Sequence, residues 1–226
     1  AKALAIQPSI GFDALIELTD GVLLDTQKVA IQSEAELLRY CYQVAGTVGL
    51  LMCDLFGVKD PVARHHAIDL GVAMQMTNIC RDILEDAQRQ RIYLPAEMLP
   101  ARVNTHGLVS GDAEQRDDAY RAAVHLLGIA NEYYASARLG YGYLPTAVRQ
   151  AIKVAARLYQ AIGEKIVAQP AEYWQRRTVV ATSTKCRLIG QLLGQRITDG
   201  SSALMLKRAR HRPILHKALD SQRFSA

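Results

Sequence analysis

The chain has 226 residues, of which 50% are hydrophobic, enough to build one large helical domain or two small ones around a sizeable core. The net charge is +5, but no module of interleaved basic and aromatic residues is evident, so nucleic acid is not an expected partner. No signal peptide and no apolar run of about 18 residues is present, which predicts a cytoplasmic protein without a membrane span. Strand formers do not alternate, and Ala, Leu, Gln, Arg and Glu dominate, so an all-α fold is predicted.

The first helices have recognisable start and stop signals. Residues 12–26 predict a short amphipathic helix. Ser33 followed by Glu36 predicts a capping box that opens a helix reaching about residue 56, where Gly57 ends it. Pro61 suits the first turn of the next helix, which is expected to continue to about residue 90 and to lie at the centre of the fold.

The second half of the chain continues the helical pattern. We expect a short helical turn from Pro95, a loop over 101–111, and helices over 112–139, 145–168 and 183–197. One domain is expected over residues 1–203. The basic tail, residues 204–226, is poorly patterned and is expected to be loosely ordered.

The cysteines and the paired histidines give no metal-type spacing. The cysteines are Cys41, Cys53, Cys80 and Cys186. Each lies in an apolar, helix-like segment, which predicts buried thiols in a reducing compartment. His65 and His66 are adjacent, so a helix would direct them about 100° apart. A solvated face is therefore predicted for them, rather than joint metal binding.

A polar stripe marks the central helix. At about 100° per residue, Gly71, Gln75, Asn78, Asp82 and Asp86 fall on one face. Oxygen ligands one turn apart suit a hard cation such as Mg²⁺, which takes carboxylates, waters and substrate phosphates. The alternative is a solvated face. The apolar lead-in over 67–76, and Asn and Gln in place of a Lys–Glu mixture, favour the metal site.

A second stripe lies on the preceding helix. Tyr42, Ala45, Gly46 and Gly49 share one face of an α-helix, and Ala45, Gly46 and Gly49 are candidates for lining a substrate cavity. Glycine in a helix interior costs about 1 kcal/mol relative to alanine, so two on one face indicate either close helix packing or room for a ligand. Both alternatives remain open. In the cavity interpretation, Tyr42 and Gly46 face Asn78.

Two segments carry a family resemblance. YCYQVAGTVG at 40–49 and QMTNICRDILEDAQRQRIYLP at 75–95 resemble the signature segments of the squalene/phytoene synthases, and the resemblance runs from about residue 12 to about residue 200. Among them, the bacterial phytoene synthases are most similar. The resemblance implies a single isoprenoid-synthase-type helical bundle around a central cavity.

The resemblance also implies a reaction. Two prenyl diphosphates, expected to be geranylgeranyl diphosphate, would condense head to head through a cyclopropylcarbinyl diphosphate to give phytoene, without NADPH. The alternative is a squalene or dehydrosqualene synthase that uses farnesyl diphosphate. A third hypothesis, from another class, is a non-catalytic helical relative that acts as a binding or assembly factor.

The resemblance assigns roles to the matching residues. Asn78, Asp82 and Asp86 match the family's second aspartate-rich motif, which binds Mg²⁺, with Mn²⁺ as an alternative. Gln75 matches a polar residue that faces the reacting centre, and Tyr42 matches a position near the diphosphates. Tyr42, Gln75, Asp82 and Asp86 are therefore the expected catalytic residues.

Further matches are expected to bind diphosphate. They are Arg81 in the motif itself, Tyr159 in ARLY, and Arg177 and Lys185 in RTVVATSTK. Preorganised cations stabilise the charge that develops on a leaving diphosphate. From the residues alone, a core aromatic at Tyr159 and surface charges at Arg177 and Lys185 are the alternatives.

The chain departs from the family in one respect. The family carries a first DxxxD motif on an earlier helix, and none precedes residue 40, where Asp13, Asp20 and Asp25 have the wrong spacing. We therefore expect the front helices to be missing and this chain alone to be inactive.

Basic residues gather in the tail. They are Lys207, Arg208, Arg210, His211 and Arg212. Such a cluster predicts peripheral association with an anionic membrane surface.

Overall fold

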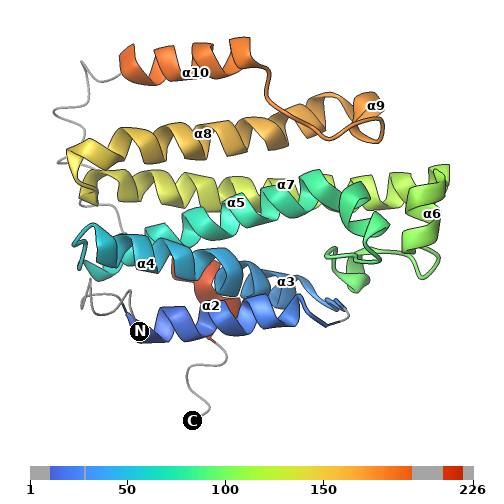
Figure 1. Cartoon of the computed structure of the whole chain (residues 1–226), viewed down its shortest axis with the longest axis horizontal. Coiled ribbons are helices and arrows are strands. Elements are labelled where there is room, and N and C mark those ends of the chain that lie inside the picture. The colour runs from blue at the N-terminus through green and yellow to red at the C-terminus, as the bar shows by residue number, and fades with distance from the viewer. Residues whose placement is uncertain (1–10, 28, 195–210, 221–226) are drawn as a thin grey trace.

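The computed structural model describes residues 11–27, 29–194 and 211–220, and every regular element in those ranges is a helix (Figure 1). The predicted all-α fold is confirmed. None of the helices in this part of the chain is both long and apolar enough to cross a membrane. The elements are α2 (Phe12–Leu24), α3 (Glu34–Cys41), η1 (Tyr42–Gly46), α4 (Thr47–Leu55), α5 (Pro61–Gln88), η2 (Ala96–Met98), α6 (Thr105–Ser110), α7 (Ala113–Gly140), η3 (Tyr141–Tyr143), α8 (Thr146–Ala168), α9 (Pro170–Tyr173), α10 (Thr182–Gly194), η5 (Pro213–His216) and α12 (Lys217–Asp220).

Helix α5 is the centre of the fold, as the sequence predicts. It packs against α3, η1, α4, α6, α7 and α8, and Figure 1 shows it between α4 and α7. Its start is set by Asp60, whose side chain accepts hydrogen bonds from the backbone amides of Val62 and Ala63, and by Pro61 in the first turn. Val72 and Met76 are completely buried, which fixes one face of α5 in the core and leaves the polar stripe on another face.

The helix expected from residue 33 to about 56 is interrupted by a π-turn. The side chain of Ser33 caps α3 as predicted, but residues Tyr42–Gly46 form the π-helical segment η1 before α4 begins. A π-turn contains one more residue than an α-turn, so it rotates the residues before it relative to those after it. The prediction that Tyr42, Ala45, Gly46 and Gly49 share one face assumed a continuous α-helix, and for Tyr42 and Gly46 it is wrong.

Backbone contact of η1 and α4 with α5 explains two glycines. A Cβ atom on Gly49 would lie 2.3 Å from the carbonyl oxygen of Ala67, and a Cβ atom on Gly71 would lie 2.3 Å from the carbonyl oxygen of Ala45. Because both clashing atoms belong to the backbone, the helices would have to separate to make room. Close helix packing is therefore the reason for glycine at position 49.

Gly49→Ala is expected to destabilise the protein by about 1–3 kcal/mol, the usual cost of overpacking a tight contact. Gly128→Ala is the matched control, because Gly128 lies inside α7 and a Cβ atom added there would meet no other atom within 4 Å. In a helix interior, alanine is more favourable than glycine by up to about 1 kcal/mol, so the control variant should not be destabilised. Urea unfolding of both variants measures the difference. Equal midpoints would contradict the contact at Gly49.

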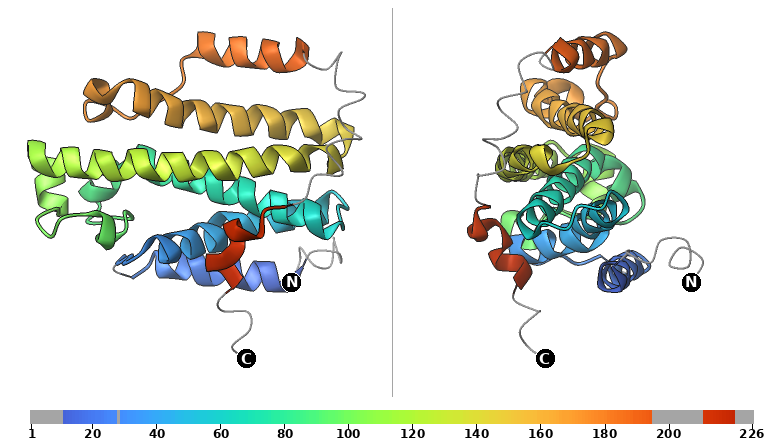
Figure 2. Two further views of the ribbon diagram at one scale, coloured as in Figure 1. Left: turned by 180° about the vertical axis from the view of Figure 1, so that it is seen from behind. Right: turned by 90° about the vertical axis from the view of Figure 1, so that its left-hand side faces the viewer.

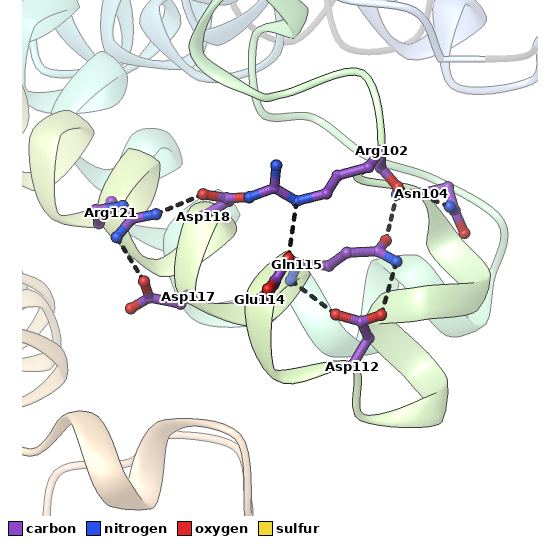
Figure 3. A network of polar contacts seen from close by, with 8 residues as sticks. All are labelled: Arg102, Asn104, Asp112, Glu114, Gln115, Asp117, Asp118 and Arg121. Atoms are coloured by element: carbon purple, nitrogen blue, oxygen red, sulfur yellow. Dashed lines mark hydrogen bonds and ion pairs between the residues drawn. The ribbon is translucent and has the colours of Figure 1, made fainter.

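The loop expected over residues 101–111 is wrong for Thr105–Ser110, which form a short helix. Asn104 caps the short helix α6 with its side chain, and Gly111 ends it at φ +92°. Arg102, just before α6, forms an ion pair with Asp118 on α7, and Asp118 also pairs with Arg121 of the same helix at 2.5 Å (Figure 3). The first pair ties the segment before α6 to α7.

Residues 211–220 form η5 and α12 and pack against α3, where Figure 2 shows them beside the blue helices. Arg212 pairs with Glu132 at 2.6 Å, and Tyr133 donates a hydrogen bond to the carbonyl oxygen of Leu215 at 2.5 Å. The expectation of a loosely ordered tail is therefore wrong for this segment. The expected domain boundary at 203/204, with Lys207, Arg208 and Arg210, lies outside the described residues.

Two expectations about single side chains also need correction. Cys186 is exposed on α10, whereas Cys41, Cys53 and Cys80 are buried as predicted. His66 is buried rather than solvated, with 2% of its surface exposed, because α5 is covered on that side by α7 and the hydroxyl of Ser136 forms a hydrogen bond with its Nδ1.

Candidate functional site

The polar stripe predicted for α5 is present. Gln75, Asn78, Asp82 and Asp86 follow one another at three- or four-residue steps along the helix, and all four are partly buried. The stripe begins beside an apolar cavity and ends among arginines, so it joins two chemically different surroundings.

The apolar cavity has a volume of about 270 Å³ and lies between α4, α5 and the start of α8. Its wall includes Ala45, Gly49, Met74, Gln75, Asn78 and Tyr141. Ala45 and Gly49 therefore share a cavity with the stripe, as the cavity interpretation predicted.

Tyr42 and Gly46 do not line this cavity. Tyr42 lines a separate cavity with His65 and His216, and a Cβ atom on Gly46 would meet the ring of Tyr42 and the side chain of Ile68. The π-turn is the reason, because it rotates Tyr42 away from the face that carries Ala45 and Gly49.

Two arginines hold Asp82. Arg81 donates to both carboxylate oxygens at 2.7 and 2.5 Å, and Arg177 donates to the same two oxygens at 2.9 and 3.1 Å. Burial alone would raise the pKa of Asp82, but the hydrogen bonds from Arg81 and Arg177 hold it below its usual range. Arg81 and Arg177 are thus both paired with the carboxylate of Asp82 in this structure.

Arg177 reaches α5 from the connection after α9, 95 residues away in sequence. Its guanidinium also lies 3.3 Å from the carboxylate of Glu85. Glu85 was not among the predicted site residues, although its place three residues after Asp82 puts it on the neighbouring surface of the same helix.

The two remaining predicted residues differ in position. Tyr159 on α8 is partly buried, packs against the main core and lies close enough to Arg177 to raise the pKa of that guanidinium, after the larger effect of Asp82. Lys185 is exposed on α10, which packs against α8 rather than α5 (Figure 1). Within the described residues the structure brings Tyr159 toward the site and leaves Lys185 outside it.

The stripe contains two groups suited to a cation. The side-chain oxygen of Asn78 is buried without a hydrogen-bond partner among the described residues. The Asp86 carboxylate has neither a hydrogen bond nor an ion pair there, and burial, together with the charges of Asp82 and Glu85, raises its pKa to about 6. An orphaned amide oxygen one turn from carboxylates on the same helix face fits a hard divalent cation, for which all of these atoms are ligands.

Asp86→Asn is expected to stabilise the metal-free protein at pH 7.5 by about 1 kcal/mol, discounted for the partial exposure of this group. The pKa of Asp86 is about 6 in the folded chain and 3.8 without its surroundings, so the native state loses stability as pH rises between those values. Asparagine does not titrate, so the variant does not lose stability over this pH range. Thermal unfolding in chelator across pH 4 to 7.5 should show an advantage that grows with pH. A constant advantage would contradict the assigned cause.

The comparisons with known proteins decide the family. The sequence model described as squalene/phytoene synthase matches residues 2–184. The 15-cis-phytoene synthase of Enterobacter agglomerans is 38% identical over 213 residues, which cover 94% of this chain and 68% of the relative. The chain belongs to the squalene/phytoene synthase family. The phytoene synthase of Thermus thermophilus is 44% identical over 161 residues, covering 70% of this chain and 53% of that protein.

Solved structures of family members have the same fold. A dehydrosqualene synthase in complex with ligand has a TM-score of 0.69 at 25% identity, with 84% of this chain and 66% of that chain covered. A squalene synthase from Alicyclobacillus acidocaldarius has a TM-score of 0.65 at 21% identity, with 74% and 62% covered. The 226-residue chain thus spans between about half and two thirds of the length of these four relatives.

Proposed function

We propose that this chain forms the cavity and one metal-binding side of a prenyltransferase that condenses two molecules of geranylgeranyl diphosphate into phytoene. The stripe on α5 carries the proposal, because it joins the apolar cavity at Gln75 and Asn78 to the carboxylates and arginines at Asp82. A prenyl diphosphate has the same two parts, an apolar tail and an anionic head. The identity to relatives named phytoene synthase supports this substrate class.

The residues of the stripe and the arginines beside it have different proposed roles. Asn78, Asp82 and Asp86 would hold Mg²⁺, with Mn²⁺ as an alternative, and a bound divalent cation neutralises charge on a leaving diphosphate. Arg81 and Arg177 supply fixed positive charge beside the same group.

The cavity protects the reacting carbons. Its apolar walls would hold the prenyl tail and exclude water from the allylic cation, and Gln75 would lie at its polar end, near the reacting centre. NADPH is not expected to be needed for phytoene. Catalytic roles for Tyr42 and Tyr159, and diphosphate contact by Lys185, remain predictions from the family resemblance.

The product assay tests the function. The chain, and a version extended at its N-terminus by a segment with the first DxxxD motif that the family resemblance implies, are incubated with geranylgeranyl diphosphate and Mg²⁺ without NADPH. Phytoene from the extended version is the expected product. A product formed only from farnesyl diphosphate would place the protein with the squalene or dehydrosqualene synthases. No product from either version, with both folded, would favour a non-catalytic binding or assembly factor.

Arg177→Ala is expected to weaken binding of a non-reactive prenyl thiolodiphosphate by about 10–100-fold, the value of one or two hydrogen bonds to a charged group. Arg176→Ala is the matched control, because the neighbouring Arg176 pairs only with Glu172 on the surface among the described residues. Isothermal titration in Mg²⁺ compares the two variants. Equal losses would indicate a general charge effect rather than a contact made by Arg177.

We also propose a cytoplasmic location with peripheral attachment to an anionic membrane surface. The basic residues of the tail support attachment, although two of them are already engaged in the fold: Arg212 pairs with Glu132, and His211 lies 3.1 Å from Asp69. Sedimentation with anionic vesicles, compared with neutral ones, measures the attachment.

A further inference from the structure

Three histidines from distant parts of the chain converge away from the acidic stripe. His65 comes from α5, whereas His211 and His216 come from the C-terminal segment that packs across α3 and α5. One ring nitrogen of each lies within 4.8 Å of the others, and within the described ranges no other group of three His, Cys, Asp or Glu side chains converges in this way. Imidazole nitrogen is a preferred ligand of Zn²⁺ and related transition metals.

A buried carboxylate lies against two of these rings and forms a hydrogen bond with that of His216. Asp69 is completely buried, its Oδ1 lies 2.8 Å from the Nε2 of His216, and its Oδ2 lies 3.1 Å from the Nε2 of His211. Ser136 donates a further hydrogen bond to Asp69 at 2.6 Å. Metal-binding histidines usually donate their second ring N–H to such a carboxylate, which fixes the tautomer and leaves the other nitrogen free to bind the metal.

The spacing of the rings fits tetrahedral coordination. The ring centre of His65 lies 4.9 Å from that of His211 and 5.2 Å from that of His216, and the last two are 4.2 Å apart. With a Zn–N distance of about 2.0–2.1 Å and tetrahedral angles, ring centres of ligating histidines lie about 5 Å apart. The ring centres therefore have about the spacing that three ligands of one ion require, and the three nitrogens, within 4.8 Å of one another, would converge further on binding.

The cluster is accessible to a metal ion. Its three histidines line a cavity of about 490 Å³ together with Tyr42 and Arg64. The positive charge of Arg64 is offset by its ion pair with Asp54. A site with three protein ligands and an open side toward solvent leaves a position for a water molecule.

We propose that His65, His211 and His216 bind one Zn²⁺-type transition metal ion, oriented by Asp69, and that this ion fastens the C-terminal segment to α5. The site is separate from the acidic stripe and differs from it in chemistry. Nitrogen ligands select transition metals, whereas the oxygen ligands at Asn78, Asp82 and Asp86 suit Mg²⁺.

Metal binding to the untagged 226-residue chain tests the proposal. Equilibrium dialysis with Zn²⁺ in the presence of millimolar Mg²⁺ is expected to give one tightly bound Zn²⁺ per chain. His65→Ala is expected to weaken binding at least about 100-fold, and Asp69→Asn about 10–100-fold, the range for losing a carboxylate behind a ligand. His106→Ala is the control, since His106 is exposed on α6, and Asp82→Asn should leave Zn²⁺ binding unchanged.

A second measurement separates metal binding from a simple hydrogen-bonded contact. Zn²⁺ is expected to slow amide hydrogen exchange in residues 213–220 of the unmodified chain but not of His65→Ala. Because His65 is on the exposed side of α5, this variant is expected to keep its helical circular dichroism. No bound Zn²⁺ at micromolar concentrations, equal affinity in His65→Ala, or unchanged exchange would overturn the proposal and leave Asp69 as a hydrogen-bonding partner only.

Discussion

Asp82→Asn is expected to lower the rate of phytoene formation at least about 100-fold, the scale measured when one preorganised charge-stabilising group is removed. The substitution preserves the shape of the side chain but removes the charge that both arginines and a divalent cation would share. The assay uses the extended version of the chain, with geranylgeranyl diphosphate at saturation. Helix content should not change, because asparagine has the shape of Asp82, whose side chain keeps 17% of its surface exposed, and the neighbours on α5 stay in place.

Asp117→Asn is the control for this experiment. Asp117 is also a carboxylate that pairs with an arginine, Arg121, but the pair lies on the surface of α7, where such contacts contribute little (Figure 3). The rate of phytoene formation by Asp117→Asn should stay near that of the unmodified protein. Near-normal turnover in Asp82→Asn would remove Asp82 from the proposed site.

The 226-residue chain by itself is expected to bind the prenyl thiolodiphosphate but to form no detectable phytoene. Its sequence contains one DxxxD segment, Asp82 to Asp86, whereas the family resemblance implies that metal ions are held between two opposed acidic motifs. Arg81 and Arg177 retain attraction for the diphosphate. With carboxylates on only one side, the charge of the leaving group would not be matched in the transition state.

Product analysis over long incubation compares the chain with its extended version. Phytoene from the extended version only is the expected result. Phytoene from the 226-residue chain would show that one acidic motif is sufficient, while its binding of the thiolodiphosphate without turnover would support the proposed division between binding and ionisation.

Local patterns were sufficient for the long helices and for the stripe on α5, but not for the short helix α6. The steps from Gln75 to Asp86 follow α-helical periodicity, and α5 remains α-helical through that region, so residues predicted to share a face do share it. The same reasoning misplaced Tyr42, because the π-turn at Tyr42–Gly46 changes the periodicity of this helix where it lies against α5.

The sequence by itself determined the all-α fold, the central helix and the positions of Asn78, Asp82 and Asp86, since each depends on residues within a few turns of one another. Only the tertiary structure decided which distant groups complete a site. Arg177 meets Asp82 across 95 residues, and His216 meets Asp69 across 147. Such pairs have no local periodicity, because the core packing of whole helices, rather than the spacing of side chains along one helix, brings them together.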